Sequence, residues 1–193
     1  MKRRTLAAAT AALLMTSALG MSACSSELVA QSGSSSAQSA ANLDHERISS
    51  VLETVGGVMA TADASLNAAD LGDQVTKGAL EMRTAQYALA NANGQALPPL
   101  DFEPTSLAIT NSDSWPRAIF NISDTSSTTL PVLEVYVQDS ARSDYKLTNY
   151  ARLLGGTHLT LPSVGTGSAY VTGDSQGFTV TPDTALAQYI TML

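Results

Sequence analysis

The chain has 193 residues, of which 10 are basic and 17 acidic, and its formal net charge at pH 7 is −7. Three of the basic residues lie within the first four positions, so the chain after residue 23 carries 7 basic and 17 acidic side chains, a formal charge of −10. Nucleic acid and anionic lipid headgroups repel such a chain, and no cluster of basic and aromatic residues offsets the repulsion. We therefore expect no binding to DNA or RNA.

The first 24 residues have the layout of an export signal. A basic start at residues 2–4 precedes an apolar run over residues 6–19, which is too short for a confident membrane span. Residues 19–24 read Leu-Gly-Met-Ser-Ala-Cys. This ending resembles the lipobox of bacterial lipoproteins, with Met21 in place of the usual leucine. The resemblance implies cleavage before Cys24 and a diacylglycerol joined to its sulfur.

Two other interpretations of this leader exist. It can be an ordinary secretory signal with a chance cysteine, and Arg3 and Arg4 also permit the twin-arginine route, although the flanking residues match it poorly. Cys24 is the only cysteine, has no disulfide partner and occupies the one position that lipidation requires. We predict that residues 1–23 are a lipoprotein signal peptide and that lipid on Cys24 anchors the protein to the cell membrane, facing outside the cytoplasm.

The lipid-bearing cysteine is followed by a low-complexity segment. Residues 24–41 are rich in Ser, Ala, Gln and Gly, so they cannot bury enough apolar surface to offset chain entropy. We predict a disordered tether with a mean reach of roughly 20–25 Å. Residues 42–193 are long enough for a single domain with a core of its own.

The domain begins with helical patterns. Apolar residues recur at three- and four-residue spacing over residues 42–66, where the Gly-Gly pair at 56–57 marks a bend or a close contact. A short helix is predicted over residues 68–75. Residues 79–92 favour a second long helix by composition, with a strand as the rival prediction. Residues 97–104 contain three prolines and form an extended crossing segment.

The pattern then changes to the alternation that is typical of half-buried strands, and short polar connections favour an antiparallel meander. Strands are predicted over residues 106–110, 117–123, 130–138 and 145–153. A small hairpin is predicted from residues 169–172 and 178–180. Thr181 and Pro182 then suit the start of a helix with an apolar stripe. That helix is either a terminal docking helix or the first piece of a longer protein.

Helices followed by a curved antiparallel sheet define an α+β fold, with the N-terminal helices packed on one face of the four strands. This order of elements favours a cystatin-like or nuclear-transport-factor-2-like cone.

Four segments carry a further resemblance. They are residues 76–90, residues 114–117 (Ser-Trp-Pro-Arg), residues 138–147, which end in Tyr-Lys-Leu, and residues 152–155. They resemble an uncharacterised family of actinobacterial secreted lipoproteins, over about residues 45–190. That family has no assigned activity, so the resemblance implies a compartment rather than a chemistry. Its members often continue past this length, which favours a missing C-terminal half.

Catalytic and metal-binding patterns are absent from the sequence. Cys24 would be lipidated, and residues 165–168 lack the preceding strand and following helix of a nucleophile elbow. His45 and His158 lie far apart, and no Cys or His cluster has zinc spacing. We therefore expect no metal and no cofactor.

The candidate binding residues are Trp115, Arg117, Arg142 and Tyr145. Arg117 can bind a carboxylate or stack on Trp115, but the interpretation that we favour places Trp115 in the core. Arg142 belongs to a mixed-charge hairpin tip at residues 139–146, whose surface ion pairs contribute only on the order of 0–1 kcal/mol.

Two functions are weighed. The first is a non-enzymatic module that binds a small ligand or an envelope protein, through the concave face of the sheet or the loops around Trp115 and Arg142. The second is a small cone-fold enzyme with a buried acid–base pair, for which Asp63, Asp70 and Tyr87 are the candidates.

Overall fold

The computed structural model describes residues 41–123, 130–157 and 159–193. The predicted leader, Cys24 and residues 24–40 of the tether lie outside the described residues, as do His158 and the predicted connection at residues 124–129. The described residues belong to one compact unit, residues 37–193.

The first helix, α1 (His45–Ser65), forms where the apolar residues recur at helical spacing. Asp44 caps its start, because its side chain accepts a hydrogen bond of 2.9 Å from the backbone N–H of Arg47. The buried face of α1 consists of Ile48, Leu52, Val55, Met59 and Ala62. A Cβ atom at Gly56 would lie 3.2 Å from the side chain of Phe102. The Gly-Gly pair therefore marks a close contact with the extended segment.

The second long helix is α2 (Lys77–Asn93), which confirms the helical prediction for residues 79–92 over the strand. It ends at Gly94, whose φ of 71° lies in the left-handed region that glycine adopts without strain. Between the two helices, η1 (Ala68–Leu71) is a 3-10 helix that covers only part of the predicted short helix. The buried face of α2 consists of Ala79, Arg83, Tyr87 and Ala90.

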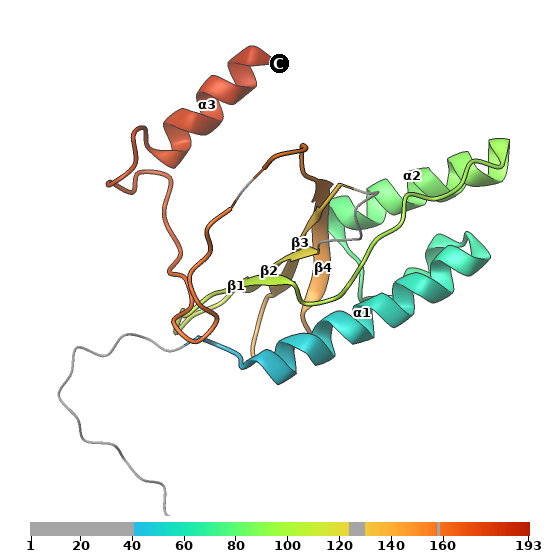
Figure 1. Ribbon diagram of the computed structural model, residues 1–193, viewed down its shortest axis with the longest axis horizontal. Helices are drawn as coiled ribbons and strands as arrows, with labels where there is room; N and C mark the ends of the chain where they lie inside the picture. Colours follow the sequence, from blue (N-terminus) through green and yellow to red (C-terminus); the bar gives the residue numbers. More distant parts are fainter. Residues whose placement is uncertain (1–40, 124–129, 158) are drawn as a thin grey trace, which may run out of the picture. The chain divides into compact units, whose positions relative to one another are not determined.

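Four antiparallel strands follow, paired in chain order. They are β1 (Ser106–Ile109), β2 (Arg117–Ser123), β3 (Val132–Gln138) and β4 (Lys146–Arg152). Ile119, Tyr136 and Leu147 lie side by side on three strands and join the core with the buried faces of both helices. Figure 1 shows α1 and α2 on the same side of the sheet. The α+β fold and the meander are confirmed, and the cone stays a prediction.

The segment after β4 differs from its prediction. No strand forms over residues 169–180, so the predicted hairpin is wrong, and only Ser168 makes an isolated bridge, to Thr110. Tyr170, Val171 and Phe178 are about half exposed. A hairpin is stable when one of its faces is buried, and these side chains stay about half exposed.

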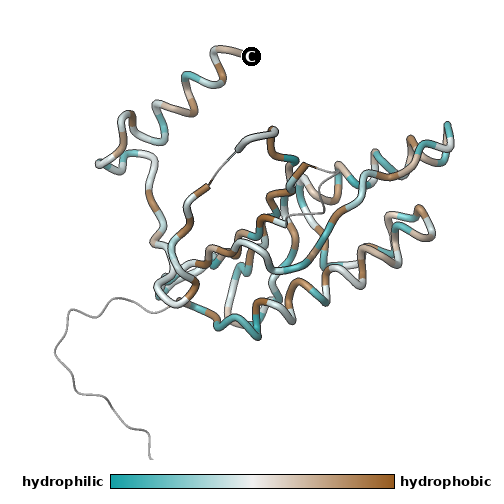
Figure 2. The backbone as a smooth tube through the Cα atoms, in the orientation of Figure 1, coloured by the Kyte–Doolittle hydropathy of each residue, from teal (hydrophilic) through white to brown (hydrophobic). Residues whose placement is uncertain are grey.

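The chain closes with α3 (Pro182–Met192). Thr181 caps it by accepting a hydrogen bond from the backbone N–H of Thr184, which confirms the predicted start. Apolar and polar residues are mixed along this helix, and none of them is buried (Figure 2). No helix within residues 41–123, 130–157 and 159–193 has the length and hydropathy needed to cross a membrane.

Candidate functional site

A cleft of about 330 Å³ lies between the start of α1 and the connection from β3 to β4. We call it the α1 cleft. One wall is a face of α1, because the 3.6-residue period of the helix brings Arg47, Ser50, Val51 and Thr54 to the same side. The rest of the lining comes from the end of β3 and the loops near it. The lining residues are Leu43, Arg47, Ser50, Val51, Thr54, Gln74, Gln138, Ser143, Asp144 and Tyr145.

Tyr145 is the buried member of this lining. Its side chain is 6% exposed, and its hydroxyl group has no hydrogen-bond partner in the described structure. Burial raises the pKa of Tyr145, and the positive charge of Arg117 opposes that shift. The hydroxyl group therefore keeps its proton at neutral pH. It is a buried donor without an acceptor, which is unusual in a folded protein.

Arg117 begins β2 and lies opposite Gln138 of β3. Its Nε atom is also buried without a partner among the described residues. Its guanidinium group lies 4.4 Å from the centre of the Trp115 ring, a cation–π contact that fixes the direction of the side chain. Of the two predicted roles of Arg117, stacking on Trp115 is therefore present.

Trp115 does not pack in the core, so the interpretation favoured from the sequence is wrong. Its side chain is 38% exposed. It lies in the bend before β2, and it belongs neither to the buried core nor to the partly buried hydrophobic residues packed against that core. The indole ring is instead held by the guanidinium group of Arg117.

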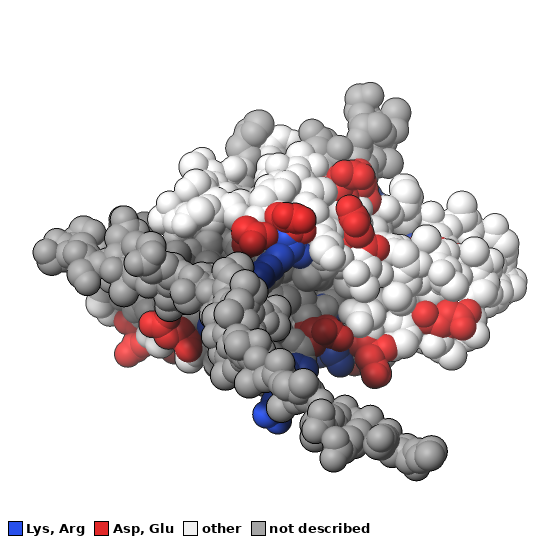
Figure 3. All heavy atoms as spheres, turned by 90° about the horizontal axis from the view of Figure 1, so that it is seen from below, with Lys and Arg blue, Asp and Glu red and all other residues white. Residues whose placement is uncertain are grey.

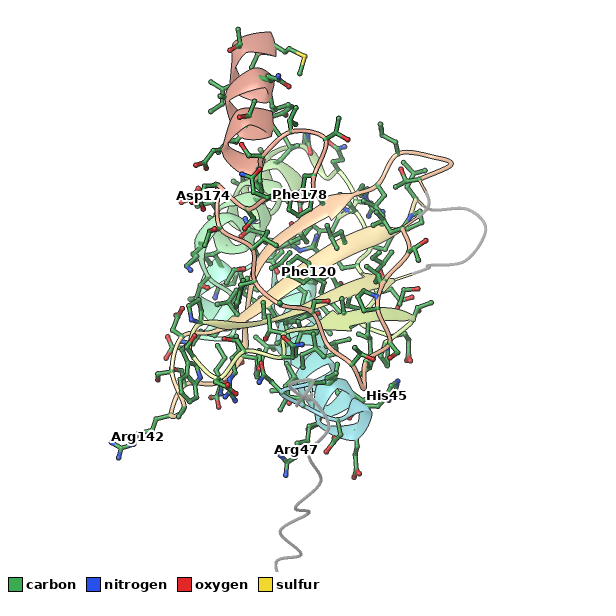
Figure 4. The ribbon with its side chains drawn as sticks, turned by 90° about the vertical axis from the view of Figure 1, so that its left-hand side faces the viewer. His45, Arg47, Phe120, Arg142, Asp174 and Phe178 are labelled. Atoms are coloured by element: carbon green, nitrogen blue, oxygen red, sulfur yellow. The ribbon has the colours of Figure 1, made fainter. Side chains whose placement is uncertain are left out.

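Arg142 is separate from this group. It is exposed on the connection between β3 and β4, and Figure 4 shows its side chain pointing away from the fold. Of the four candidate residues, the structure thus brings Trp115, Arg117 and Tyr145 together and leaves Arg142 in solvent.

The α1 cleft is suited to bind a group that accepts hydrogen bonds. Tyr145 of the lining and its neighbour Arg117 hold unused donors, and Arg47 is the one basic side chain among the lining residues. Asp144 is the one acidic side chain among the lining residues. A carboxylate or a carbonyl oxygen satisfies such donors, and a charged acceptor makes the stronger bond.

The candidate acid–base pair lies elsewhere, between α1 and α2. Tyr87 donates to a carboxylate oxygen of Asp63 at 2.6 Å, and Arg83 donates to the same carboxylate through Nε at 2.8 Å and through Nη2. Asp70 is exposed and accepts a hydrogen bond from Ser65. The structure therefore joins Asp63 to Tyr87 and leaves Asp70 out. Because Arg83 already engages both oxygens of Asp63, this group holds the two helices together.

Glu134 is a chemically unusual residue that the sequence did not single out. It is fully buried on β3, and its Oε2 atom accepts hydrogen bonds from Tyr136 at 2.8 Å and from Asn121 at 3.1 Å. Its Oε1 atom and the Oδ1 atom of Asn121 have no partner among the described residues. Burial raises the pKa of Glu134 to about 7, although both hydrogen bonds oppose the shift.

A signal for Glu134 existed in the alternation of β3. Glu134 shares a face with Val132 and Tyr136, and all three are buried. An acidic residue between two apolar residues of the same strand face is a candidate buried carboxyl.

Comparisons with models of protein families, with curated proteins and with solved structures found no match to this chain. Within the described residues, no group of three or more His, Cys, Asp or Glu side chains could hold a metal ion.

Replacing Tyr145 by Phe is expected to raise the free energy of unfolding by about 1 kcal/mol, because it removes a buried hydroxyl group that has no partner. Tyr150→Phe is the matched control on β4, since the Tyr150 hydroxyl donates to Gln86 at 3.1 Å. Tyr150→Phe should lower the free energy of unfolding by about 1 kcal/mol. Urea unfolding of both variants measures the difference. Equal destabilisation would mean that the Tyr145 hydroxyl is already bonded within the protein.

Proposed function

We propose that the protein is a membrane-anchored lipoprotein outside the cytoplasm whose domain binds a small ligand or an envelope protein without catalysing a reaction. The observation that carries the binding role is the buried, unpaired hydroxyl group of Tyr145 in the lining of the α1 cleft, next to a second buried, unpaired donor on Arg117. The anchor is supported by the position of Cys24 at the end of the leader.

Charge supports attachment through lipid rather than through the protein surface. Figure 3 shows acidic side chains spread over the face that it draws, with few basic side chains among them. An acidic domain is repelled by anionic headgroups, whereas two acyl chains hold a protein stably at a bilayer. The tether then gives the domain a reach of roughly 20–25 Å from the membrane.

The ligand or partner would present an acceptor, best a carboxylate, to the α1 cleft. Arg117 is already directed by the ring of Trp115, so little side-chain freedom is lost when the ligand binds. Buried donors that are unpaired in the free protein gain their first hydrogen bond on binding. The free-energy cost of burying these donors without hydrogen bonds is thus offset when the ligand supplies an acceptor.

Cys24→Ala tests the anchor. The wild-type chain is expected in the membrane fraction of the producing bacterium, and Cys24→Ala in the medium or the soluble fraction, because the sulfur is the only site for the thioether bond. Ser22→Ala is the matched control, since it keeps a small residue next to the cleavage site. Retention of Cys24→Ala in membranes would exclude the lipid anchor.

A further inference from the structure

A second cavity lies on the face of the sheet that is turned away from α1 and α2. Its volume is about 400 Å³. Ala108, Phe120, Ile122 and Leu133 of the strands form its floor, and the segment at residues 159–171 forms its wall. Figure 4 shows Phe120 on the sheet face that it turns to the viewer, behind the chain that follows β4. We call this space the outer cavity.

Among the described residues, backbone hydrogen bonds join the wall of the outer cavity to one edge of the sheet. Ser168 donates its backbone N–H to the carbonyl of Ile109 at 2.7 Å, and its own carbonyl accepts from the N–H of Asn111. These bonds hold the wall at the end of the edge strand β1. Over β2 and β3 the wall stands away from the sheet, and the small side chain of Ala108 adds to the space.

The lining is mostly apolar, and its side-chain hydroxyl groups come from Thr110, Ser168 and Tyr170. No charged side chain lines the outer cavity. The hydroxyl group of Thr110 already donates to Asn42 at 2.8 Å and accepts from the N–H of Ala118 at 3.1 Å. An occupant with buried polar groups would therefore lose its hydrogen bonds to water without replacement. The occupant must be apolar along the length that enters.

The size and position of the outer cavity indicate a hydrocarbon chain. Its volume falls in the range of roughly 300–1,000 Å³ that is typical of small-molecule sites. Phe120, Tyr170 and Val171 are between 38% and 55% exposed, so an apolar occupant would remove their surface from water. The start of the described chain is bonded to this lining, since the backbone N–H of Asn42 donates to the carbonyl of Thr110 at 2.9 Å.

We propose that the outer cavity binds one hydrocarbon chain of a lipid, with the polar end of the lipid in water at the opening. The chain comes either from the protein's own acylated Cys24 or from a membrane lipid. This site is independent of the α1 cleft, which lies on the opposite face of the sheet and offers polar donors.

The test is binding of cis-parinaric acid, a fluorescent fatty acid, to the full chain carrying Cys24→Ala. Val171→Glu places a carboxylate in the wall of the cavity, whereas Val180→Glu changes an exposed valine just before α3 that does not line the cavity. Saturable binding is expected, weakened about tenfold or more by Val171→Glu and unchanged by Val180→Glu. No saturable binding, or equal weakening by both variants, would overturn the proposal.

The same probe separates the two sources of the hydrocarbon chain. If the acyl chain on Cys24 fills the cavity, the lipidated wild-type protein should exclude the probe, while Cys24→Ala binds it. If a membrane lipid fills the cavity, both proteins should bind the probe once the lipid that co-purifies with them has been removed. Unfolding curves for the two glutamate variants confirm that each is folded.

Discussion

Replacing Asp63 by Asn is expected to lower the free energy of unfolding by about 3 kcal/mol, because it leaves a buried guanidinium group without its counter-ion. The side chain of Arg83 is completely buried, and it donates to both carboxylate oxygens of Asp63. An asparagine has one oxygen and no charge, so one of these bonds and the ion pair are lost. The Asp63 side chain is 28% exposed, which places the expected loss at the low end of the range for buried pairs.

Asp70→Asn is the matched control for this prediction. Asp70 is exposed and accepts a hydrogen bond from the Ser65 hydroxyl, which asparagine can replace through its own oxygen. Asp70→Asn should change the free energy of unfolding by no more than about 0.5 kcal/mol. Chemical unfolding monitored by circular dichroism compares the two variants. If Asp63→Asn were as mild as Asp70→Asn, the pair would not stabilise the contact between α1 and α2, and the interpretation of Asp63 and Tyr87 as an acid–base pair would regain weight.

The second large effect concerns pH. The pKa of Glu134 is raised from its ordinary value of 4.5 to about 7, mainly by burial. Between these two values the folded protein binds a proton that the unfolded chain has released, so stability falls as the pH rises through this window. Below pH 4.5 both states are protonated at this group, and above pH 7 the folded protein carries a buried carboxylate. Between these two pH values the free energy of unfolding is expected to fall by about 3 kcal/mol.

Glu134→Gln should remove this contribution. Glutamine keeps an oxygen that accepts from Tyr136 and Asn121, but it does not ionise. The variant should therefore be more stable than the wild-type protein at pH 8 and close to it at pH 4.5. Glu81→Gln, an exposed carboxyl group on α2, should leave the wild-type pH profile unchanged. Urea unfolding across this pH range measures both, and parallel profiles for Glu134→Gln and the wild-type protein would contradict the assignment.

The helices and strands could be predicted because each has one buried face, so its apolar residues recur with a period of 3.6 residues in a helix and two residues in a strand.

The sequence did not predict which face of β3 meets the helices. Leu133 and Val135 look like the core face, yet they are half-buried, while Glu134 and Tyr136 are fully buried. Burial of a carboxyl group there depends on Asn121 of the neighbouring strand, a contact that alternation within one strand does not contain.

The candidate site was predicted in part. The local motif around Trp115 and Arg117 was distinctive in sequence, and the two side chains stack. The exposure of Trp115 was not foreseen, because an aromatic residue before a strand has no pattern that separates a core position from a surface one. The role of Arg83 was hidden for a related reason, since its partner Asp63 is 20 residues away on another helix.

The binding role of the α1 cleft is tested most directly by native mass spectrometry of the lipidated full chain released from membranes in mild detergent. The account predicts that the wild-type protein carries a bound mass beyond its chain and lipid. Tyr145→Phe should lose a mass that Tyr150→Phe and Val171→Glu both keep, whereas a mass that Val171→Glu alone loses belongs to the outer cavity. The proposal would be contradicted if every bound mass of the wild-type protein, other than its own lipid and the occupant of the outer cavity, were retained by Tyr145→Phe, or if there were no such mass.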